Sequence, residues 1–215
     1  MIKKEMNNNI YFVSGIDTGI GKSYATGFIA KQWNAAGLRT ITQKLVQTGN
    51  TSISEDIILH RELMGIAFTQ EDMQKITMPE IFSYPASPHL AARIDKREIN
   101  FEKMRQATIQ LSQRYDAVLI EGAGGLMVPL TENYLIIDYI KEMDYPLLFV
   151  TSGKLGSINH TLLSLEAVAR RRIQLHTVIY NTFPVPEDNT ISADTQRYLR
   201  TYIQTRFPET AFIVI

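Results

Sequence analysis

The feature that most constrains the fold is a set of short apolar runs in which hydrophobic and polar residues do not alternate. They are DAVLIEGAGG, PLLFVTSG, LHTVIYN and TAFIVI, and IYFVSG near the start is a similar short buried strand. A strand without alternation is buried on both faces, as in a parallel sheet covered by helices. Segments with helical spacing separate the runs. We therefore expect right-handed crossovers and a mainly parallel sheet, with ligands at the carboxyl ends of its strands.

Helical spacing and its stop signals locate the other elements. Apolar residues at helical spacing predict a helix that begins at Lys22 and stops at Gly37, and a second helix that Ser54 caps and Gly65 ends. Three prolines predict extended chain and turns over Phe68–Ser87 and just after it. A further strand is expected at 38–45, and further helices at 101–115, 133–144, 157–172 and 192–207.

Length and composition limit the number of domains and the kind of partner. The 215 residues fit one domain, 1–215, which would bury roughly 70% of the surface of the unfolded chain. Basic and acidic residues number 22 each, so the chain lacks the field that nucleic acids and anionic membranes attract. We expect a small polar ligand and neither of those partners. The absence of cysteine excludes disulfides and thiolate chemistry.

The first residues give no sign of export. MIKKEMNNN lacks the apolar stretch of a signal peptide. The longest apolar runs fall far below the roughly 18 to 20 residues that span a bilayer. We expect an untargeted tail and a soluble, cytoplasmic protein.

VSGIDTGIGKS, Val13–Ser23, ends like a phosphate-binding loop but has an irregular spacing. The usual pattern, G-x-x-x-x-G-K-[ST], places glycine where this chain has Ile16, and Gly15 lies one residue further back. A strand precedes the loop and a helix follows it, so backbone N–H groups would converge on a bound anion. Lys22 is then a candidate for the β- and γ-phosphates, and the Ser23 hydroxyl for Mg²⁺. The alternative is a glycine-rich turn with a chance Gly-Lys-Ser.

Two carboxylates are candidates for the metal side of such a site. The strand AVLIE delivers Glu121 to its carboxyl end, and the glycines after it let the backbone approach a ligand. Glu121 would hold Mg²⁺ against the phosphates, with Asp56 on the second helix as another oxygen ligand. The alternative for Glu121 is a helix cap or a salt bridge.

Polar residues after other strands are candidates for binding. Lys44 ends the second strand, near the expected position of a γ-phosphate. In SYPASPHLAAR, Ser87 and His89 precede a short helix whose donors suit a polar substrate, although the tract is otherwise a loop. VTSGKLGSINHT is another candidate anion site, in which Ser157 or Asn159 could equally be a cap. The four histidines lack metal-ligand spacing, so no zinc site is expected.

The motifs GIDTGIGKS, QKLVQTG, SPH, EGAGG and GKLGSINH, in this order, resemble the dethiobiotin synthetase family over nearly the whole chain. The phosphate-binding loop of that family also has glycine, five residues and Gly-Lys-[Thr/Ser], which makes the irregular spacing a family mark. EGAGG is shared with cobyric-acid-type amidotransferases, whereas KLGSINH is more specific. The resemblance implies an α/β P-loop NTPase fold, with a mainly parallel sheet and helices on both faces, and a homodimer.

The resemblance also implies a ligase of biotin synthesis that uses MgATP. Such an enzyme joins CO₂ to 7,8-diaminononanoate as a carbamate and phosphorylates the carbamate. The second amine then expels phosphate and closes the ureido ring, which gives dethiobiotin, ADP and phosphate. Lys22 and Lys44 would be catalytic, because they would neutralise the transferring phosphoryl group and the carbamate.

Matching motifs imply three sets of binding residues. Those for ATP are Thr18, Gly19, Ile20, Gly21, Lys22, Ser23, Glu121, Gly122, Ala123, Gly124 and Asn181. Those for the diamine are Thr18, Lys44, Thr48, Ser87 and Pro88, joined by Leu155, Gly156, Ser157 and Asn159 of the second subunit, whose N–H donors would suit the substrate carboxylate. Those for Mg²⁺ are Ser23, Asp56 and Glu121. The amide of Asn181 would meet the N6/N7 edge of adenine.

The sequence departs from the family pattern at three places. Leu45 stands where the family usually has proline, and Ser23 replaces the commoner threonine but keeps the hydroxyl. The sequence stops at AFIVI, whereas members of the family continue through a segment that helps to enclose adenine. Two alternatives remain open: a related ATP-dependent ligase that uses another small amine, and an ATPase switch. The partitioning ATPases of this fold carry a second lysine where this chain has Asp17.

Overall fold

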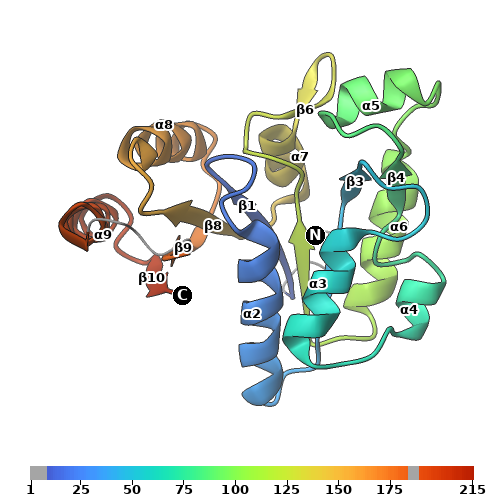
Figure 1. Cartoon of the computed structure of the whole chain (residues 1–215), viewed down its shortest axis with the longest axis horizontal. Coiled ribbons are helices and arrows are strands. Elements are labelled where there is room, and N and C mark those ends of the chain that lie inside the picture. Colours follow the sequence, from blue (N-terminus) through green and yellow to red (C-terminus); the bar gives the residue numbers. More distant parts are fainter. Residues whose placement is uncertain (1–8, 184–188) are drawn as a thin grey trace.

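A parallel sheet forms the centre of the molecule (Figure 1). The computed structural model describes residues 9–183 and 189–215, and residues 1–8 of the expected N-terminal tail lie outside them. In this part of the chain, six strands pair in the order β10-β9-β8-β1-β5-β2, all in parallel. They are β1 (Ile10–Gly15), β2 (Thr40–Lys44), β5 (Ala117–Glu121), β8 (Leu147–Ser152), β9 (Leu175–Asn181) and β10 (Ala211–Val214). The predicted α/β fold is confirmed.

Helices cover both faces of this sheet (Figure 1). Side chains of α2 and α3 pack on one face, and side chains of α6, α7, α8 and α9 pack on the other. The helices are α2 (Lys22–Ala35), α3 (Glu55–Met64), α4 (Gln70–Met73), α5 (Pro88–Ile94), α6 (Phe101–Ser112), α7 (Ile136–Met143), α8 (Ser157–Arg170) and α9 (Asn189–Arg206). No helix in the described ranges is long and apolar enough to cross a membrane.

Two apolar clusters explain why the strands show no alternation. In β1, Phe12 belongs to the cluster under α6–α9, whereas its neighbour Val13 belongs to the cluster under α2. In β8, Phe149 and Val150 divide in the same way. Because successive side chains of a strand point to opposite faces, both positions of each pair must be apolar.

Short elements surround the sheet, and residues 134–135, predicted as the start of a helix at 133–144, form part of one short strand instead. β3 (Val46–Thr48) pairs in parallel with β4 (Glu80–Phe82), and β6 (Pro129–Thr131) pairs antiparallel with β7 (Tyr134–Leu135). The expectation of extended chain and turns over 68–87 holds for β4 but is wrong for α4. That helix begins with a capping box, in which Thr69 Oγ1 accepts the Asp72 N–H at 3.2 Å and Asp72 accepts the Thr69 N–H.

The two caps predicted for α3 are present. The Ser54 hydroxyl accepts the Ile57 N–H at 3.2 Å, and Gly65 ends the helix in the left-handed region at φ 70°. These caps set where α3 begins beside β2 and therefore where its first turn lies. That turn carries Asp56 to the edge of the sheet at which β1, β2 and β5 end.

Candidate active site

The loop after β1 leaves the first backbone N–H groups of α2 available to an anion. Gly21 directly precedes α2 and lies in the left-handed region, at φ 89°. As a glycine, it has no side chain that could cap the helix. The first turn of α2 contains no acidic residue. Positive helix ends of this kind favour phosphate. Lys22 lies in the same turn, and its Nζ donates to the Asp17 carbonyl at 2.6 Å.

Burial changes the acidity of Lys22. Its side chain is largely removed from solvent, which disfavours the ammonium form and lowers the pKa from 10.5 to about 8. The carboxylates of Glu121 and Asp56 oppose this shift, whereas the nearby ammonium of Lys44 adds to it. Lys22 is therefore a cation that a bound phosphate would stabilise.

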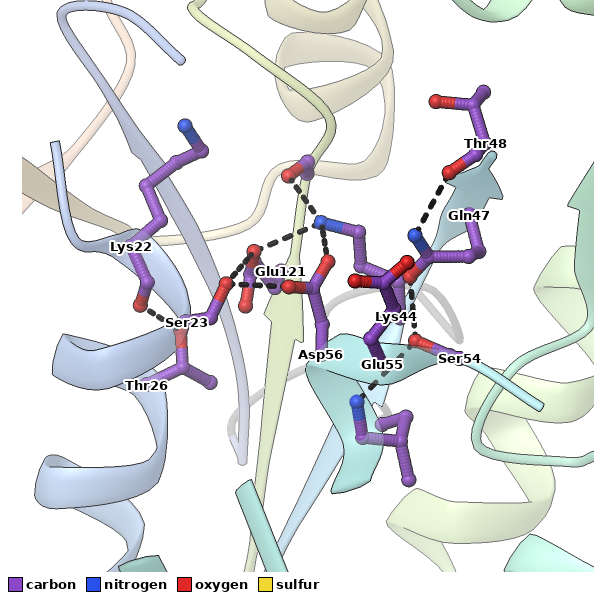
Figure 2. A network of polar contacts seen from close by, with 12 residues as sticks. Lys22, Ser23, Thr26, Lys44, Gln47, Thr48, Ser54, Glu55, Asp56 and Glu121 are labelled. Atoms are coloured by element: carbon purple, nitrogen blue, oxygen red, sulfur yellow. Dashed lines mark hydrogen bonds and ion pairs between the residues drawn. The ribbon is translucent and has the colours of Figure 1, made fainter. Parts of the chain in front are cut away.

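Ser23, the next residue of α2, faces two carboxylates from different elements (Figure 2). Its Oγ lies 2.7 Å from Oδ1 of Asp56 and 3.0 Å from Oε1 of Glu121. Asp56 comes from the first turn of α3, and Glu121 ends β5. The three side chains predicted as Mg²⁺ ligands are thus in direct contact.

Lys44, at the end of β2, forms ion pairs with both carboxylates (Figure 2). Its Nζ lies 2.6 Å from Oδ2 of Asp56 and 2.8 Å from Oε1 of Glu121, and it donates to the Gly122 carbonyl at 3.3 Å. Burial alone would lower the pKa of Lys44, but the two carboxylates outweigh it and raise the pKa. Burial alone would raise the pKa of Glu121, but Lys44 and a hydrogen bond from His60 hold it well below its usual range.

The oxygen donors fit a magnesium ion. In the described ranges, no group of three or more His, Cys, Asp or Glu side chains could hold a metal by itself. Mg²⁺ in nucleotide sites, however, is usually held by one or two carboxylates together with substrate phosphates and water. Asp56, Glu121 and the Ser23 hydroxyl match that pattern. The ammonium groups of Lys44 and Lys22 balance the two carboxylates, so the charge of a bound metal would serve to neutralise the phosphates.

A cavity of about 900 Å³ opens at this edge of the sheet. Most of the residues expected to bind ligands line it. They are Thr18, Gly19, Gly21, Lys22, Ser23, Lys44, Thr48, Asp56, Ser87, Pro88, Glu121, Ala123, Gly124 and Asn181. The structure therefore brings together side chains from the loop after β1, from α3, from α5 and from the ends of four strands.

Two residues of the expected ATP set do not line the cavity. The side chain of Ile20 is buried in the apolar cluster under α2. Gly122 packs against the ring of Phe12, where a Cβ would lie only 2.8 Å from Cε1. Both contribute through the backbone, because the Ile20 carbonyl holds Asn181 and the Gly122 carbonyl accepts from Lys44.

The segment that begins α8 also lies outside this cavity. Leu155 is 85% exposed, and Gly156 caps the helix with φ 93° and no side-chain bond. Ser157 is buried, with its hydroxyl 3.2 Å from that of Ser152, and Asn159 is exposed. The segment does not contact the cavity of its own chain, and its assignment to the site of a second subunit remains a prediction.

Asn181 ends β9 beside the phosphate-binding loop. Its Nδ2 donates to the Ile20 carbonyl at 2.8 Å, and its Oδ1 accepts the Phe183 N–H at 3.0 Å. One N–H and one lone pair of the amide remain for a ligand. The expected contact with adenine stays a prediction, but the bond to Ile20 shows that Asn181 also fixes the loop.

Three hydrogen bonds in or beside the site were not predicted from the sequence. Gln47 lines the cavity and accepts the Ser54 hydroxyl at 2.5 Å. His60 hydrogen-bonds Glu121, and its i, i+4 spacing from Asp56 was a usable signal that both lie on one face of α3. Leu45 donates its N–H to the Glu121 carbonyl at 3.0 Å, a bond that the proline usual in the family cannot make.

This arrangement defines the class of the protein. A Gly-Lys-Ser loop joins the central strand of a parallel sheet to a helix, and carboxylates from neighbouring elements face its serine, as in P-loop nucleotide-binding proteins. A family model described as an AAA domain matches residues 9–207. The chain belongs to the ATP-dependent dethiobiotin synthetase family, because three curated members resemble it over most of their length.

The similarity to these members is high. ATP-dependent dethiobiotin synthetase BioD 2 of Haemophilus ducreyi is 53% identical over 206 residues, which cover 96% of this chain and 97% of the relative. The protein of the same name from Pasteurella multocida is 49% identical, with 96% of each chain covered. Dethiobiotin synthetase BioD of Chlorobaculum tepidum is 48% identical over 92% of this chain and 82% of its own. The family resemblance and the ligase class expected from the sequence are confirmed.

Solved structures resemble this chain in fold alone. The signal recognition particle receptor FtsY of Elizabethkingia anophelis, solved with GDP, gives a TM-score of 0.54 at 17% identity, over 94% of this chain and 55% of that one. A ParA family ATPase from Chlorobium tepidum gives 0.53 at 13% identity, over 96% and 84%. Both support the P-loop fold and say nothing about the reaction.

Proposed function

We propose that the chain is a dethiobiotin synthetase, which uses ATP to join CO₂ to 7,8-diaminononanoate and to close the ureido ring. The names of its relatives support this reaction. The structural observation that carries the proposal is the position of Lys44. Its buried ammonium lies beside the Ser23 and Glu121 side chains, at the wall of the same cavity as the phosphate-binding loop.

In the proposed binding mode, the phosphates of ATP lie against the N-terminus of α2. Lys22 would turn from the Asp17 carbonyl to the β- and γ-phosphates. Ser23, Asp56 and Glu121 would hold Mg²⁺, whose contribution when bound is to neutralise charge on these phosphates. Asp17, which replaces the second lysine of the partitioning ATPases, is exposed, and its side chain accepts the Thr18 N–H at 2.7 Å.

Lys44 would supply the charge that the chemistry needs. In the structure it neutralises carboxylates, and in the reaction its ammonium would shift toward the carbamate and the transferring phosphoryl group. A preorganised cation in a site that excludes water stabilises charge that develops in the transition state.

The proposed reaction proceeds in three steps. One amine nitrogen bonds the carbon of CO₂ and loses a proton, which gives a carbamate. A carbamate oxygen then attacks the γ-phosphorus, and ADP leaves. Finally the second amine attacks the carbonyl carbon, phosphate leaves with the C–O bonding pair, and a proton is released. Thr18, Thr48 and Ser87 line the cavity where the two amines would be held.

We also propose a homodimer in which each cavity is completed by the start of α8 from the other subunit. The exposure of Leu155, and the absence of a side-chain cap at Gly156, support this proposal. A mixture of two inactive variants, Lys44→Ala and Asn159→Ala, tests it. Random exchange of subunits should restore roughly a quarter of the wild-type sites, because one site of each mixed dimer is intact. Recovery of no activity, or a monomer in sedimentation, contradicts the shared site.

The overall reaction is tested by omission. The purified protein is given MgATP, labelled bicarbonate and 7,8-diaminononanoate, and ADP release and labelled product are followed as each component is left out. We expect turnover only when all components are present. We also propose that the enzyme acts in the cytoplasm. ADP release that does not depend on the diamine contradicts the proposal. Diamines of other chain lengths distinguish the related-ligase alternative, since a better substrate among them would replace 7,8-diaminononanoate.

A further inference from the structure

We propose that His60 is a positioning residue, which fixes the orientation of the Glu121 carboxylate for metal binding. His60 lies on α3, one turn after Asp56, and its side chain is fully buried. Its Nε2 lies 2.8 Å from Oε2 of Glu121, the oxygen that does not face Ser23 and Lys44. The inference rests on the proposed role of Glu121 as a Mg²⁺ ligand.

The other ring nitrogen of His60 is held as well. Its Nδ1 lies 3.0 Å from the Thr42 hydroxyl, and that hydroxyl lies 2.7 Å from Nη1 of Arg61. Arg61 is in turn held by Asp72 through two bonds of 2.8 Å. All these groups are buried, so the chain of hydrogen bonds connects the core of the molecule to the edge of the cavity.

The direction of each bond follows from what its groups can do. A guanidinium only donates, so the Thr42 oxygen accepts from Arg61. An ionised carboxylate only accepts, so Nε2 of His60 carries the hydrogen that it shares with Glu121. Nδ1 can then accept the hydroxyl hydrogen of Thr42. A neutral imidazole in this single tautomer satisfies every partner.

This arrangement gives the two oxygens of Glu121 separate partners. Oε2 is occupied by His60, and Oε1 is directed at Ser23 and Lys44. Rotation of the carboxylate would break the bond to His60, in a place without solvent to replace it. Partners of this kind behind a metal ligand commonly change metal affinity by 10- to 100-fold when they are removed.

Substitution of His60 tests the inference through binding, without turnover. The affinity for ADP is measured by calorimetry with and without Mg²⁺, and the ratio of the two affinities reports the metal contribution. We expect His60→Leu to reduce this ratio by about tenfold or more, with the Mg²⁺-free affinity unchanged. His60→Gln keeps a donor near the position of Nε2 and should recover most of the ratio. His176→Leu is the matched control, because His176 is half-buried beside Thr177 and does not line the cavity. It lies at the start of β9, whereas Asn181 at the end of the strand lines the cavity.

Three results in the His60 variants would contradict the proposed role of His60. An unchanged ratio in His60→Leu, or an equal loss of affinity with and without Mg²⁺, overturns the inference. The second result would mean that the histidine only supports the fold, and failure of His60→Gln to recover the ratio would mean the same. Glu121→Gln separates the two levels of argument. A lower ratio in Glu121→Gln alone overturns only the role of His60, whereas no change in either variant also overturns the proposed metal role of Glu121.

Discussion

Lys44 Nζ lies 2.8 Å from Oε1 of Glu121, and both side chains are almost completely buried. A buried ion pair is weak evidence for stability, since the loss of hydration offsets much of the attraction. Its position is more informative. The pair joins the ends of adjacent strands β2 and β5 at the wall of the cavity, where perturbed acid–base groups commonly have a catalytic role. The same geometry makes separate predictions for stability and for rate.

Replacement of Lys44 by methionine should reduce both stability and activity. Glu121 would keep its buried carboxylate without the ammonium, which costs about 3–5 kcal/mol of unfolding free energy. Loss of the cation from the reaction should lower the rate by about 10²- to 10³-fold. Urea unfolding at neutral pH measures the first effect, and dethiobiotin formation by the folded protein measures the second.

The double variant Lys44→Met/Glu121→Gln identifies the source of the instability. It removes the unpaired charge, so it should recover most of the lost unfolding free energy but none of the activity. Equal instability of the single and double variants would assign the loss to packing instead of charge. An active double variant would remove Lys44 from the proposed mechanism.

Binding of ADP should weaken as the pH rises through about 8, the pKa to which burial lowers Lys22. Below this pH the ammonium is present before ADP arrives. Above it the phosphates must bind a neutral amine or draw a proton from solvent, so the affinity falls by at most about tenfold per pH unit. Calorimetry without Mg²⁺, in buffers of different ionisation enthalpy, should detect proton uptake. Lys22→Arg keeps its charge throughout and should show a flat profile; an equally steep fall in that variant assigns the proton to another group.

The order of elements and the main ligand set could be predicted from the sequence because their signals are local. Apolar runs identify the strands, and the caps Ser54 and Gly65 identify α3. Parallel strands have their carboxyl ends at one edge, so Lys44 and Glu121 could be expected together. Strands β3, β4, β6 and β7 could not be predicted, because each has only two or three residues, too few for a periodic pattern.

The contact of His60 with Glu121 could not be predicted, because it depends on how α3 is rotated against β2 and β5. Sequence spacing places His60 on the face of Asp56 but does not say whether that face meets a carboxylate or apolar side chains. Nor does it show that Thr42 and Arg61 hold the other ring nitrogen. Tertiary packing decides both.

Stability should depend on acid through Asp72. Burial alone would raise its pKa, but bonds from Arg61 and Thr77 outweigh this and lower it from 3.8. A lowered pKa means that the carboxylate stabilises the fold fully above pH 3.8, and that this contribution is lost as the pH falls through the pKa of the folded protein. Asp72→Asn should lose about 3–5 kcal/mol near neutral pH, because Arg61 would be left buried and unpaired.

Urea unfolding of wild type and Asp72→Asn over a range of acidic pH checks this dependence. The difference between them should be constant near neutral pH and shrink once the pH falls below 3.8. Asp116→Asn is the matched control, because Asp116 pairs with Arg39 at the surface and should cause a much smaller loss. A difference for Asp72→Asn that does not change with pH would show that charge is not its origin.

Gly21→Ala should impair the phosphate-binding loop more than Gly19→Ala does. Both glycines lie in the left-handed region, at φ 89° and 73°, so alanine carries a backbone cost of about 1–2 kcal/mol at either position. A Cβ at Gly19 meets no atom within 4 Å, whereas a Cβ at Gly21 collides with Nδ2 of Asn181. That amide is buried and bonded to the Ile20 carbonyl, so it cannot move without loss of the bond. We therefore expect a modest loss of ADP affinity in Gly19→Ala and a loss at least about tenfold larger in Gly21→Ala.

Addition of Asn181→Ala should restore part of the unfolding free energy lost in Gly21→Ala and none of that lost in Gly19→Ala. Urea unfolding of the three single variants and the two double variants measures this coupling. Equal effects of the two glycine substitutions, or no such coupling, would show that backbone conformation alone fixes Gly21 and that Asn181 does not shape the loop.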